Sequence, residues 1–508
     1  MTLLAPTPLT SAEPLPGAWR DAIVLALAVQ FAVWGLGSIL FLTNLHYDTL
    51  ELIYWGRDWT LGYGKHPPLG TWIVDLTQRI GALPIVSVLV LGQLTVSVSA
   101  ALIWLTVRLM ASPRAAAFAV IVYLASPAST YFSVQVNHNS LLMPFWCATL
   151  YCAMRFFIRQ DRISGAWMGL AAALAMLVKY EVVFLFGTLF VLAVTEQKFR
   201  SVFRCQGAWI GLFVFSIVLG PHIWWLVSHD WSVLIYAVDA MRTSGWYGLL
   251  KTANDVVVGQ AALLIGPVLI YVIGRWIGVR FIHRDASWLP LILAFGPSAF
   301  MLLGALLTQQ DPRQGWTIPF APNIAIAVAI AFTVETTRPQ DSLPSVWGYR
   351  AALLSVAQFI LFVGFLMGRD AFGHPVIAYE LQSRKLAEMV TEAWEDHHEG
   401  PLRCLVIAQG SVAASVVLWL DDRPNFVDLS SNYWARLEQI QSCGSVGAVA
   451  ISTGAADDIK IRRAFPNSCP DAKRVMIPTH FGGLSSRVPV SLTYVPPLAE
   501  KGACAERD

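Results

Sequence analysis

The stretch HYDTLELIYWGRDWTLGYGKHPPLGTW, residues 46–72, is the first polar interruption in a chain dominated by long apolar runs. It directly follows the first of these runs. Its charged and aromatic side chains are interleaved: Asp48, Glu51, Arg57, Asp58, Lys65 and His66 stand among Tyr47, Tyr54, Trp55, Trp59, Tyr63 and Trp72. We interpret it as a polar, titratable loop at the end of an apolar segment, where a functional site is to be sought.

Composition assigns the chain to a broad class. Of its 508 residues, 56% are hydrophobic and 13% are charged, and the mean hydropathy is +0.56. Soluble proteins carry about 25% charged residues. The sequence therefore predicts a polytopic α-helical membrane protein. A net charge of +2 without a dense basic run gives no sign of a nucleic-acid partner.

Eleven apolar runs have about the length needed to cross some 30 Å of hydrocarbon at about 1.5 Å per residue. They cover residues 21–43, 83–107, 115–132, 140–157, 163–178, 182–195, 207–227, 254–274, 287–307, 316–334 and 350–368. Several are short or lie close together. We expect about eleven spans in a transmembrane domain of residues 21–368, with a first outer loop at 44–82.

Basic residues set the expected orientation. With the N-terminus inside, the inner loops hold most of them: Arg108, Arg114, Arg155, Arg159, Arg162, Lys198, Arg200, Arg204, Arg275, Arg280, Arg284 and Arg338. The positive-inside rule then makes residues 1–20 a cytoplasmic tail. That segment is Pro-rich and lacks the basic start and apolar core of a signal peptide. An odd number of spans places the C-terminus outside.

Residues 369–508 differ in composition from the rest and predict a small α/β domain on the outer face. Short strands are expected at 403–410, 414–420 and 446–453, and amphipathic helices at 381–398 and 433–443. The end of the domain, rich in Pro and Gly, is expected to be irregular.

The cysteines fall into two groups. Cys147, Cys152 and Cys205 lie in or beside apolar runs and are most simply buried apolar residues. Cys404, Cys443, Cys469 and Cys504 lie in the predicted outer domain, where an oxidising compartment would allow disulfides. No Cys-x-x-Cys pair appears, so we expect no structural zinc site.

Asp48 and Glu51 are three residues apart, which places both on one face of a helix. Paired carboxylates suit general-base catalysis or metal coordination, and acidic residues at membrane depth suggest function. The alternative is that they are loop residues solvated at headgroup level beside an interfacial belt of Tyr and Trp. Lys65 and His66, in a Pro-rich turn, are suited to hold a lipid phosphate.

These motifs resemble those of the multispanning C-type glycosyltransferases (GT-C fold), which use polyprenyl-phosphate sugars. This family includes the bacterial aminoarabinose transferase of lipid A and the protein O-mannosyltransferases. Bacterial members show Asp-x-x-Glu, then Trp-Gly, then Gly-Tyr-x-Lys-His-Pro-Pro-Leu, found here as Asp48, Glu51, Trp55, Gly56, Gly62, Tyr63, Lys65, His66, Pro67, Pro68 and Leu69. The hydropathy pattern and the outer C-terminal domain fit along the whole chain.

Further polar groups at predicted outer ends of spans agree with this resemblance. They are Asn137, His138 and Asn139; Lys179 and Tyr180; His222; and Arg313. The resemblance makes Lys179 a second phosphate ligand beside Lys65 and His66, and Arg313 a further one. Each residue also has a purely structural interpretation: Lys179 can extend to the interface, His222 can cap a helix, and Arg313 can pair with Asp311.

The sequence departs from the aminoarabinose transferases at one position. Those enzymes have a metal-binding Glu before the basic residue of the motif, whereas this chain has Lys65 before His66. His66 would take the place of their phosphate-binding lysine. We therefore expect no cofactor and metal-independent catalysis, although a divalent metal stays possible.

The resemblance implies inverting transfer of a sugar from a polyprenyl phosphate to an acceptor hydroxyl. Asp48 would be the general base and Glu51 would orient Asp48 or the acceptor. Contacts with sugar or acceptor are expected from Tyr47, Trp55, Tyr63, Asn137, His138, Asn139, Tyr180 and His222. The expected acceptor is an envelope glycolipid such as lipid A or lipopolysaccharide core.

The implied location is the bacterial inner membrane, with the site and residues 369–508 in the periplasm. A protein O-glycosyltransferase of the same class is one alternative. A lipid-linked sugar transporter is another, although it would predict internal repeats that the sequence does not show. A ligase acting on diphosphate-linked oligosaccharide would predict a large outer loop between late spans.

Overall fold

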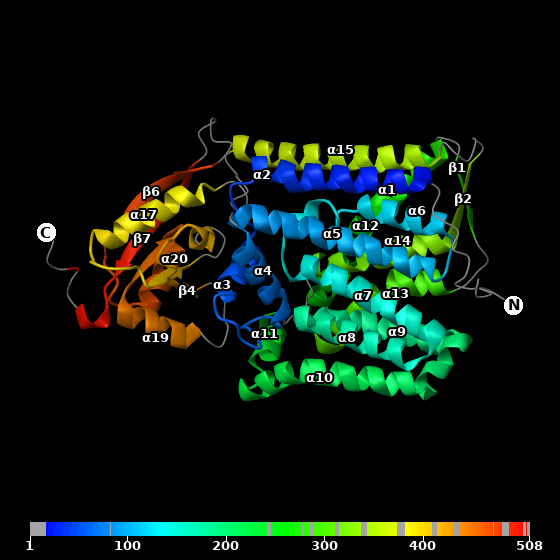
Figure 1. Ribbon diagram of the computed structural model, residues 1–508. Coiled ribbons are helices and arrows are strands. Elements are labelled where there is room, and N and C mark those ends of the chain that lie inside the picture. The colour runs from blue at the N-terminus through cyan, green and yellow to red at the C-terminus, as the bar shows by residue number, and fades with distance from the viewer. Residues whose placement is uncertain are drawn as a thin grey trace.

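The computed structural model describes residues 17–81, 83–240, 245–276, 279–283, 288–309, 314–336, 343–372, 381–408, 414–429, 436–470, 472–479, 487–500 and 504. It consists of a helical bundle with a small sheet domain at one end, and the short helices α3 and α4 lie where the two parts meet (Figure 1).

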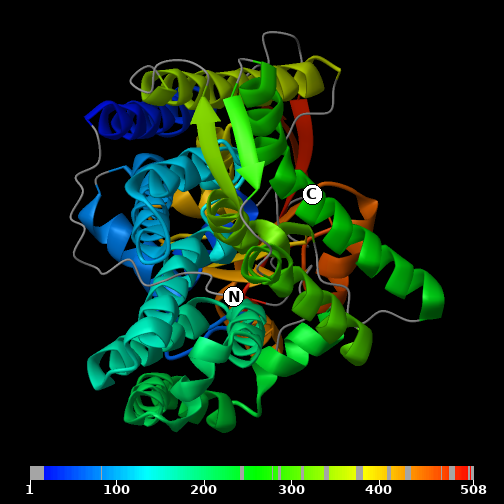
Figure 2. The same cartoon turned by 90° about the vertical axis from the view of Figure 1, so that its right-hand side faces the viewer.

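Long apolar helices make up the bundle. α1 (Gly17–Gln30) continues through a π-helical segment (Phe31–Gly37) into α2 (Ser38–Phe41). The others are α5 (Pro84–Arg108), α6 (Pro113–Leu124), α7 (His138–Arg159), α8 (Arg162–Val178), α9 (Val183–Thr195), α10 (Gln206–Ser228), α11 (Ser232–Ala240), α12 (Gly245–Trp276), α13 (Leu289–Thr308), α14 (Ala321–Ala331) and α15 (Leu343–Ala371). Figure 2 shows the bundle from its far end.

Each of the eleven predicted runs contains an apolar helix, although the helix in 115–132 ends at Leu124 and the helix in 316–334 ends at Ala331. Among the described residues, seven helices are long and apolar enough to cross a membrane, or eight if the pair Tyr180–Thr195 and Gln197–Arg204, bent by 109°, is one span. Three shorter apolar helices cover Pro113–Leu124, Arg162–Val178 and Gly315–Ala331. The predicted multispan helical fold is confirmed, and the count of eleven spans stays a prediction.

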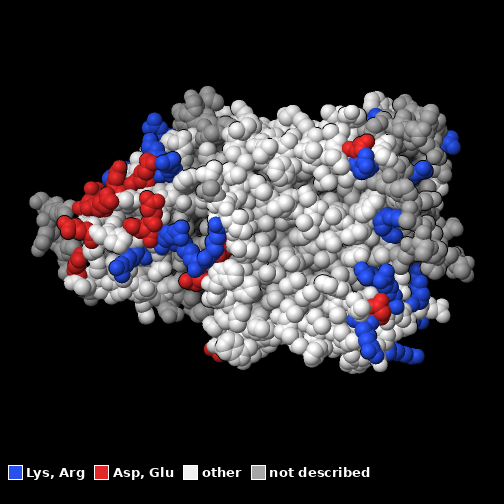
Figure 3. Space-filling view, viewed as in Figure 1, with Lys and Arg blue, Asp and Glu red and all other residues white. Residues whose placement is uncertain are grey.

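The two ends of the bundle differ in charge. Lys and Arg gather at the end away from the sheet domain, and on the face shown in Figure 3 a broad band of uncharged described residues separates them from that domain. The antiparallel pair β1 (Val279–His283) and β2 (Phe332–Thr336) lies at this basic end (Figure 1). The start of α1 lies there too, opposite the sheet domain (Figure 1). The orientation in the membrane stays a prediction.

Glycines set the distance between α8 and α10. A Cβ atom on Gly165 would lie 2.0 Å from the Gly207 carbonyl oxygen, and one on Gly169 would lie 2.0 Å from that of Gly211. Glycine spacing of four residues on both helices is the pattern that lets membrane helices approach closely. The two backbones therefore touch along one shared stripe.

A buried irregular segment, residues 125–137, joins α6 to α7. Backbone without regular structure is tolerated at such depth only where its polar groups find partners. Two glutamines from neighbouring helices supply some of them: Gln30 donates to the Ser129 carbonyl and Gln358 to the Ala125 carbonyl. Gln93 donates to the Ser133 side-chain hydroxyl. These bonds fix where α7 begins, and with it Asn137 and His138.

The C-terminal part forms a five-stranded mixed sheet of order β4-β3-β5-β7-β6. Its strands are β3 (Cys404–Ile407), β4 (Asn425–Asp428), β5 (Ala448–Ser452), β6 (Lys473–Pro478) and β7 (Arg487–Val495). Its helices are α17 (Ser383–Glu395), α19 (Arg436–Val446) and α20 (Ala455–Ala464). β3, β4 and β5 run parallel, whereas β7 runs antiparallel to β5 and β6. The expected small α/β domain is confirmed.

Two details of that prediction were wrong. Residues 414–420 are not a strand, because Ala414–Leu418 forms a 3₁₀ helix. Val416, Val417 and Leu420 are buried, a helical spacing rather than an alternating one. The end of the domain is not irregular throughout, since β6 and β7 lie there. The predicted boundary at residue 369 falls in the last turn of α15, where the Asp370 carboxylate accepts a hydrogen bond from the Thr479 hydroxyl.

The four cysteines of this domain form two disulfides, Cys404–Cys443 and Cys469–Cys504. The first ties the start of β3 to α19. The second joins residue 504 to the segment before β6. Cys147, Cys152 and Cys205 are free thiols.

We expect Gly211→Ala to lower the thermal unfolding temperature of the protein in detergent. Its Cβ atom would lie 2.7 Å from the Gly165 carbonyl oxygen and would push α8 and α10 apart. Gly220→Ala, in the same helix, is the matched control because its Cβ atom meets nothing within 4 Å. Both changes gain about 1 kcal/mol of helix propensity, so equal unfolding temperatures for the two variants would contradict the close packing.

Candidate functional site

The opening polar stretch folds into two short helices. α3 (Tyr47–Trp55) begins at His46, whose ring nitrogen accepts a hydrogen bond from the Asp48 backbone N–H. α4 (Leu69–Ile80) follows the Pro-rich turn. Asp48 and Glu51 therefore lie on one helix, as their spacing predicts.

The two carboxylates have different environments. The Asp48 side chain is 46% exposed, and the Asn137 amide donates to its Oδ2 atom over 3.4 Å. The Glu51 side chain is 9% exposed, and its Oε1 atom forms an ion pair with Lys65 Nζ at 2.5 Å. Asp48 is thus the carboxylate that a second molecule could reach.

Burial governs the protonation of this ion pair. It raises the pKa of Glu51 to about 7, against the opposing effect of the Lys65 charge. Burial lowers the pKa of Lys65, but the Glu51 charge outweighs this and leaves the lysine pKa above its usual value. Lys65 therefore stays a cation, while the pKa of Glu51 lies close to neutral pH.

His66 lies against the first turn of α7. Its ring centroid is 3.8 Å from that of His138, and Trp55 is tilted against both rings. Burial holds the pKa of His66 well below its usual range, and the charges of Lys179 and Lys65 act in the same direction. A neutral His66 offers one N–H donor and one acceptor.

The Asn137-His138-Asn139 stretch is built around a capped helix start. The Asn137 side chain accepts from two backbone N–H groups of α7, and Ser140 completes a capping box. His138 is buried, and its Nε2 atom has no hydrogen-bond partner among the described residues. That nitrogen is a polar group in need of a partner.

Lys179, at the end of α8, makes three contacts. Its Nζ atom forms an ion pair with Glu181 Oε2 at 2.5 Å, donates to the Asn139 side-chain oxygen, and lies 4.6 Å from the centre of the Trp316 ring. The Glu181 side chain is 1% exposed. Each of the two described lysines of the site is therefore already paired with a buried carboxylate.

Tyr180 and His222 hold the polar stretch in place. His222 Nδ1 donates to the Leu61 carbonyl at 2.6 Å, so in the neutral ring Nε2 accepts from the Tyr180 hydroxyl, also at 2.6 Å. At Gly62, a Cβ atom would lie 2.4 Å from the Trp225 ring. This loop is thus clamped against α10.

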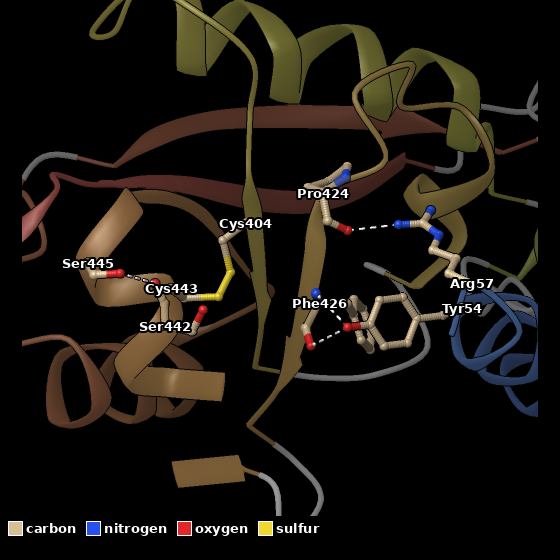
Figure 4. Close-up of a disulfide and its surroundings, with 8 residues drawn as sticks. All are labelled: Tyr54, Arg57, Cys404, Pro424, Phe426, Ser442, Cys443 and Ser445. Carbon is tan, nitrogen blue, oxygen red and sulfur yellow. Dashed lines mark hydrogen bonds between the residues drawn. A yellow bond between two sulfur atoms is a disulfide. The ribbon is translucent and has the colours of Figure 1, made fainter. Parts of the chain in front are cut away.

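α3 and the residues that follow it also dock on the sheet domain. The Tyr54 hydroxyl accepts from the Phe426 N–H at 3.0 Å and lies 3.3 Å from its carbonyl, while Arg57 donates to the Pro424 carbonyl at 2.8 Å (Figure 4). These groups pair with β4, the edge strand of the sheet. At the end of β4, Asp428 accepts from the Tyr47 hydroxyl at 2.6 Å.

Direct contacts join most of the predicted site residues into three groups, which neighbouring positions in the chain connect into one cluster. The groups are Tyr47, Glu51 and Lys65; Trp55, Tyr63, His66 and His138; and Asp48, Asn137, Asn139 and Lys179. The rings of Trp55 and Tyr63 stack on each other, with centroids 5.7 Å apart. Tyr180 and His222 contact the loop at Leu61 instead. Arg313 and Asp311 lie outside the described residues.

Glu181 and Asp428 were not assigned a role from the sequence. Glu181 directly follows Lys179-Tyr180 and could have been noticed as a counter-ion. Asp428 is 381 residues from Tyr47, and β4 was not predicted. No group of three His, Cys, Asp or Glu residues among the described ones is arranged to hold a metal ion, and metal independence stays a prediction.

Residues 65–225 match the model of the family described as dolichyl-phosphate-mannose-protein mannosyltransferase. This segment begins in the motif from which the resemblance was drawn and extends through α10. No curated protein matches this sequence. The family match agrees with the resemblance stated above.

Among solved structures, the chain is similar to ArnT from Cupriavidus metallidurans bound to undecaprenyl phosphate, with 13% identity, a TM-score of 0.58, and coverage of 94% of this chain and 98% of that one. The apo state of the same protein gives 14% identity with the same TM-score and coverage. An oligosaccharyltransferase from Archaeoglobus fulgidus gives 10% identity and a TM-score of 0.42, over 80% of this chain and 64% of that one. The ArnT likeness confirms the expected fold over nearly the whole chain.

The raised pKa of Glu51 predicts a pH-dependent stability. Between about pH 4.5 and 7 the folded protein keeps a proton on Glu51 that the unfolded chain has lost. This contribution to the free energy of unfolding therefore falls as the pH rises, by about 3 kcal/mol over the whole window.

Glu51→Gln has no titrating proton and lacks this contribution. We expect the stability of the wild type relative to Glu51→Gln to fall between pH 4.5 and 7, as measured by thermal unfolding in detergent. A difference that stays constant or rises over this range would show that burial does not control the Glu51 carboxyl.

Proposed function

We propose that the chain is a membrane glycosyltransferase of the C type that transfers a sugar from a polyprenyl phosphate to a hydroxyl of an envelope glycolipid. The observation that carries this proposal is a chain of contacts that joins the half-exposed Asp48 carboxylate through Asn137 and Asn139 to Lys179. His138, between the two asparagines, packs against His66. A base and a set of phosphate ligands are what inverting transfer from a phosphate requires.

Asp48 acts as the general base. It takes the proton of the acceptor hydroxyl while that oxygen forms its bond to the anomeric carbon, and the bond from that carbon to the phosphate oxygen breaks. The configuration at the anomeric carbon is inverted, and polyprenyl phosphate leaves. The Asn137 amide, 3.4 Å from Asp48 Oδ2, orients the carboxylate. Glu51 is buried and bound to Lys65, which suits a positioning role.

The donor phosphate contacts His66, Lys179 and Lys65, with Arg313 as a further ligand. The ArnT structure was solved with undecaprenyl phosphate, which supports a polyprenyl-phosphate donor for a chain of the same fold. The unpartnered His138 Nε2, buried against His66, gives the phosphate an additional polar neighbour.

Binding of the phosphate requires the ion pairs to rearrange. Lys65 and Lys179 are bound to Glu51 and Glu181, so an entering phosphate competes with both carboxylates. A Glu51 with a pKa of about 7 can accept a proton and release Lys65 at little cost near neutral pH. Lys65 can therefore exchange Glu51 for the phosphate, although it is paired with Glu51 in the free protein.

The sugar lies between the base and the phosphate ligands. It contacts Tyr47, Trp55, Asn137, His138 and Asn139. Tyr63 stacks on Trp55, and Tyr180 and His222 hold the loop at Leu61. The acceptor is a lipid A, a lipopolysaccharide core or another glycolipid, reached from the periplasmic face of the bacterial inner membrane, where residues 369–508 stand.

We expect Asp48→Asn to abolish transfer of a radiolabelled sugar from polyprenyl phosphate to an envelope lipid extract, with a loss of at least about 10²-fold. Asp58→Asn is the matched control, since Asp58 is an exposed acidic residue of the same loop. Donor binding by Asp48→Asn should persist. Normal transfer by Asp48→Asn would show that Asp48 is not the general base, and Glu51 would be the next candidate.

The same assay separates the alternatives. A labelled protein product in place of a lipid would favour a protein O-glycosyltransferase. Movement of lipid-linked sugar across a liposome, without transfer to an acceptor, would favour a transporter.

We expect Lys179→Met to weaken binding of undecaprenyl phosphate by about tenfold or more, measured by quenching of intrinsic tryptophan fluorescence, because Trp316 lies beside Nζ. Lys385→Met, an exposed lysine of α17, is the control. Equal affinities of the two variants for undecaprenyl phosphate would show that Lys179 is not a ligand of the phosphate.

A further inference from the structure

The sheet domain reaches the candidate site through one buried carboxylate. Asp428 ends β4, is 2% exposed, and its Oδ2 atom accepts from the Tyr47 hydroxyl at 2.6 Å. The same hydroxyl lies 3.3 Å from Glu51 Oε1, the atom that Lys65 contacts. One tyrosine hydroxyl therefore stands between a carboxylate of the sheet domain and a carboxylate of the site.

A tyrosine hydroxyl carries one proton and donates it to one acceptor at a time. With Asp428 as the nearer acceptor, that proton points away from Glu51. Lys65 then keeps Glu51 Oε1 without competition from Tyr47. Without Asp428, the proton would turn to Glu51 and bind the atom that Lys65 now holds.

We propose that Asp428 is a positioning residue of the transferase site, which directs the Tyr47 proton away from Glu51 and so leaves Glu51 to Lys65. This inference rests on the proposed function, in which Lys65 passes from Glu51 to the donor phosphate. It assigns the C-terminal domain a direct part in the site.

Contacts between α3 and β4 fix the position of Asp428 relative to Tyr47. Tyr47, Glu51 and Tyr54 lie at positions i, i+4 and i+7 of α3, one face of the helix. Tyr54 pairs with the Phe426 backbone, which fixes the register of β4 against α3. The Leu429 N–H donates to the Ile407 carbonyl at 2.7 Å, which secures the chain just beyond Asp428. This register places the Asp428 carboxylate next to the Tyr47 hydroxyl at the first turn of α3.

Several charged or titratable groups face Glu51. They are Tyr47 and Asp48 from α3, Lys65 from the loop and Asp428 from β4. Burial is the main cause that raises the pKa of Glu51, and the charges of Asp48 and then Asp428 raise it further. Removing the Asp428 charge should therefore make Glu51 ionise at lower pH.

The test compares Asp428→Asn with Asp422→Asn. Asp422 is a second acidic residue of the same domain, whose carboxylate accepts from the Leu402 N–H. We expect Asp428→Asn to lower kcat by about tenfold or more, because misplacement of a site group by about 1 Å can cost 10²-fold. The alkaline limb of its pH–rate profile should shift to lower pH, because Lys65 is released only while Glu51 holds a proton. Asp428→Glu should restore part of the rate.

Asp422→Asn should change stability without moving the pH–rate profile. An unshifted profile for Asp428→Asn, or equal shifts in both variants, would overturn the proposal even where Asp48→Asn abolishes transfer. If the wild type transfers no sugar, the proposed function itself fails.

The Tyr47–Asp428 contact can also be tested without activity. Unfolding free energies of Tyr47→Phe, Asp428→Asn and the double variant should be non-additive. Additive values would overturn the contact and, with it, the positioning role.

Discussion

Charge buried beside a membrane must be neutralised close at hand, and this constraint shapes the whole site. Removing one partner of a buried ion pair costs about 3–5 kcal/mol, because the other charge is left uncompensated. Lys65 and Lys179 accordingly each contact a carboxylate at 2.5 Å. Asp48 is different, since it has no lysine beside it among the described residues: its Oδ2 atom lies 3.4 Å from the Asn137 amide and 3.7 Å from the His46 ring, and it is half exposed. The site thus separates its paired charges from the carboxylate that can do chemistry.

The helical bundle was predictable because lipid imposes strong rules on sequence. Long apolar runs must be helices, since a lipid-exposed backbone has to satisfy its own hydrogen bonds. The motif around Asp48 and His66 was readable for a related reason, as polar residues stand out against an apolar background. The parallel strands at 404–407 and 448–452 were likewise clear from short apolar runs.

What the sequence did not reveal depends on contacts between distant parts of the chain. The counter-ion of Lys65 is 14 residues away and the acceptor of the Tyr47 proton is 381 residues away. β4 is four residues long and has no clear alternation to mark it. Residues 414–420 form an apolar run whose helical form follows from packing against neighbouring elements. Local pattern cannot supply such information.

The contact between α3 and the edge strand β4 can form only late in the synthesis of the chain. α3 leaves the ribosome 372 residues before Phe426, the residue whose backbone it pairs with. At about 5–20 residues per second, roughly 20 to 75 seconds pass between the two. During that interval most of the bundle is synthesised while Tyr54 and Arg57 have no strand to bind. The contacts of Tyr54 and Arg57 with the sheet domain therefore form only after the last quarter of the chain has begun to emerge. The site is complete only when translation is nearly over.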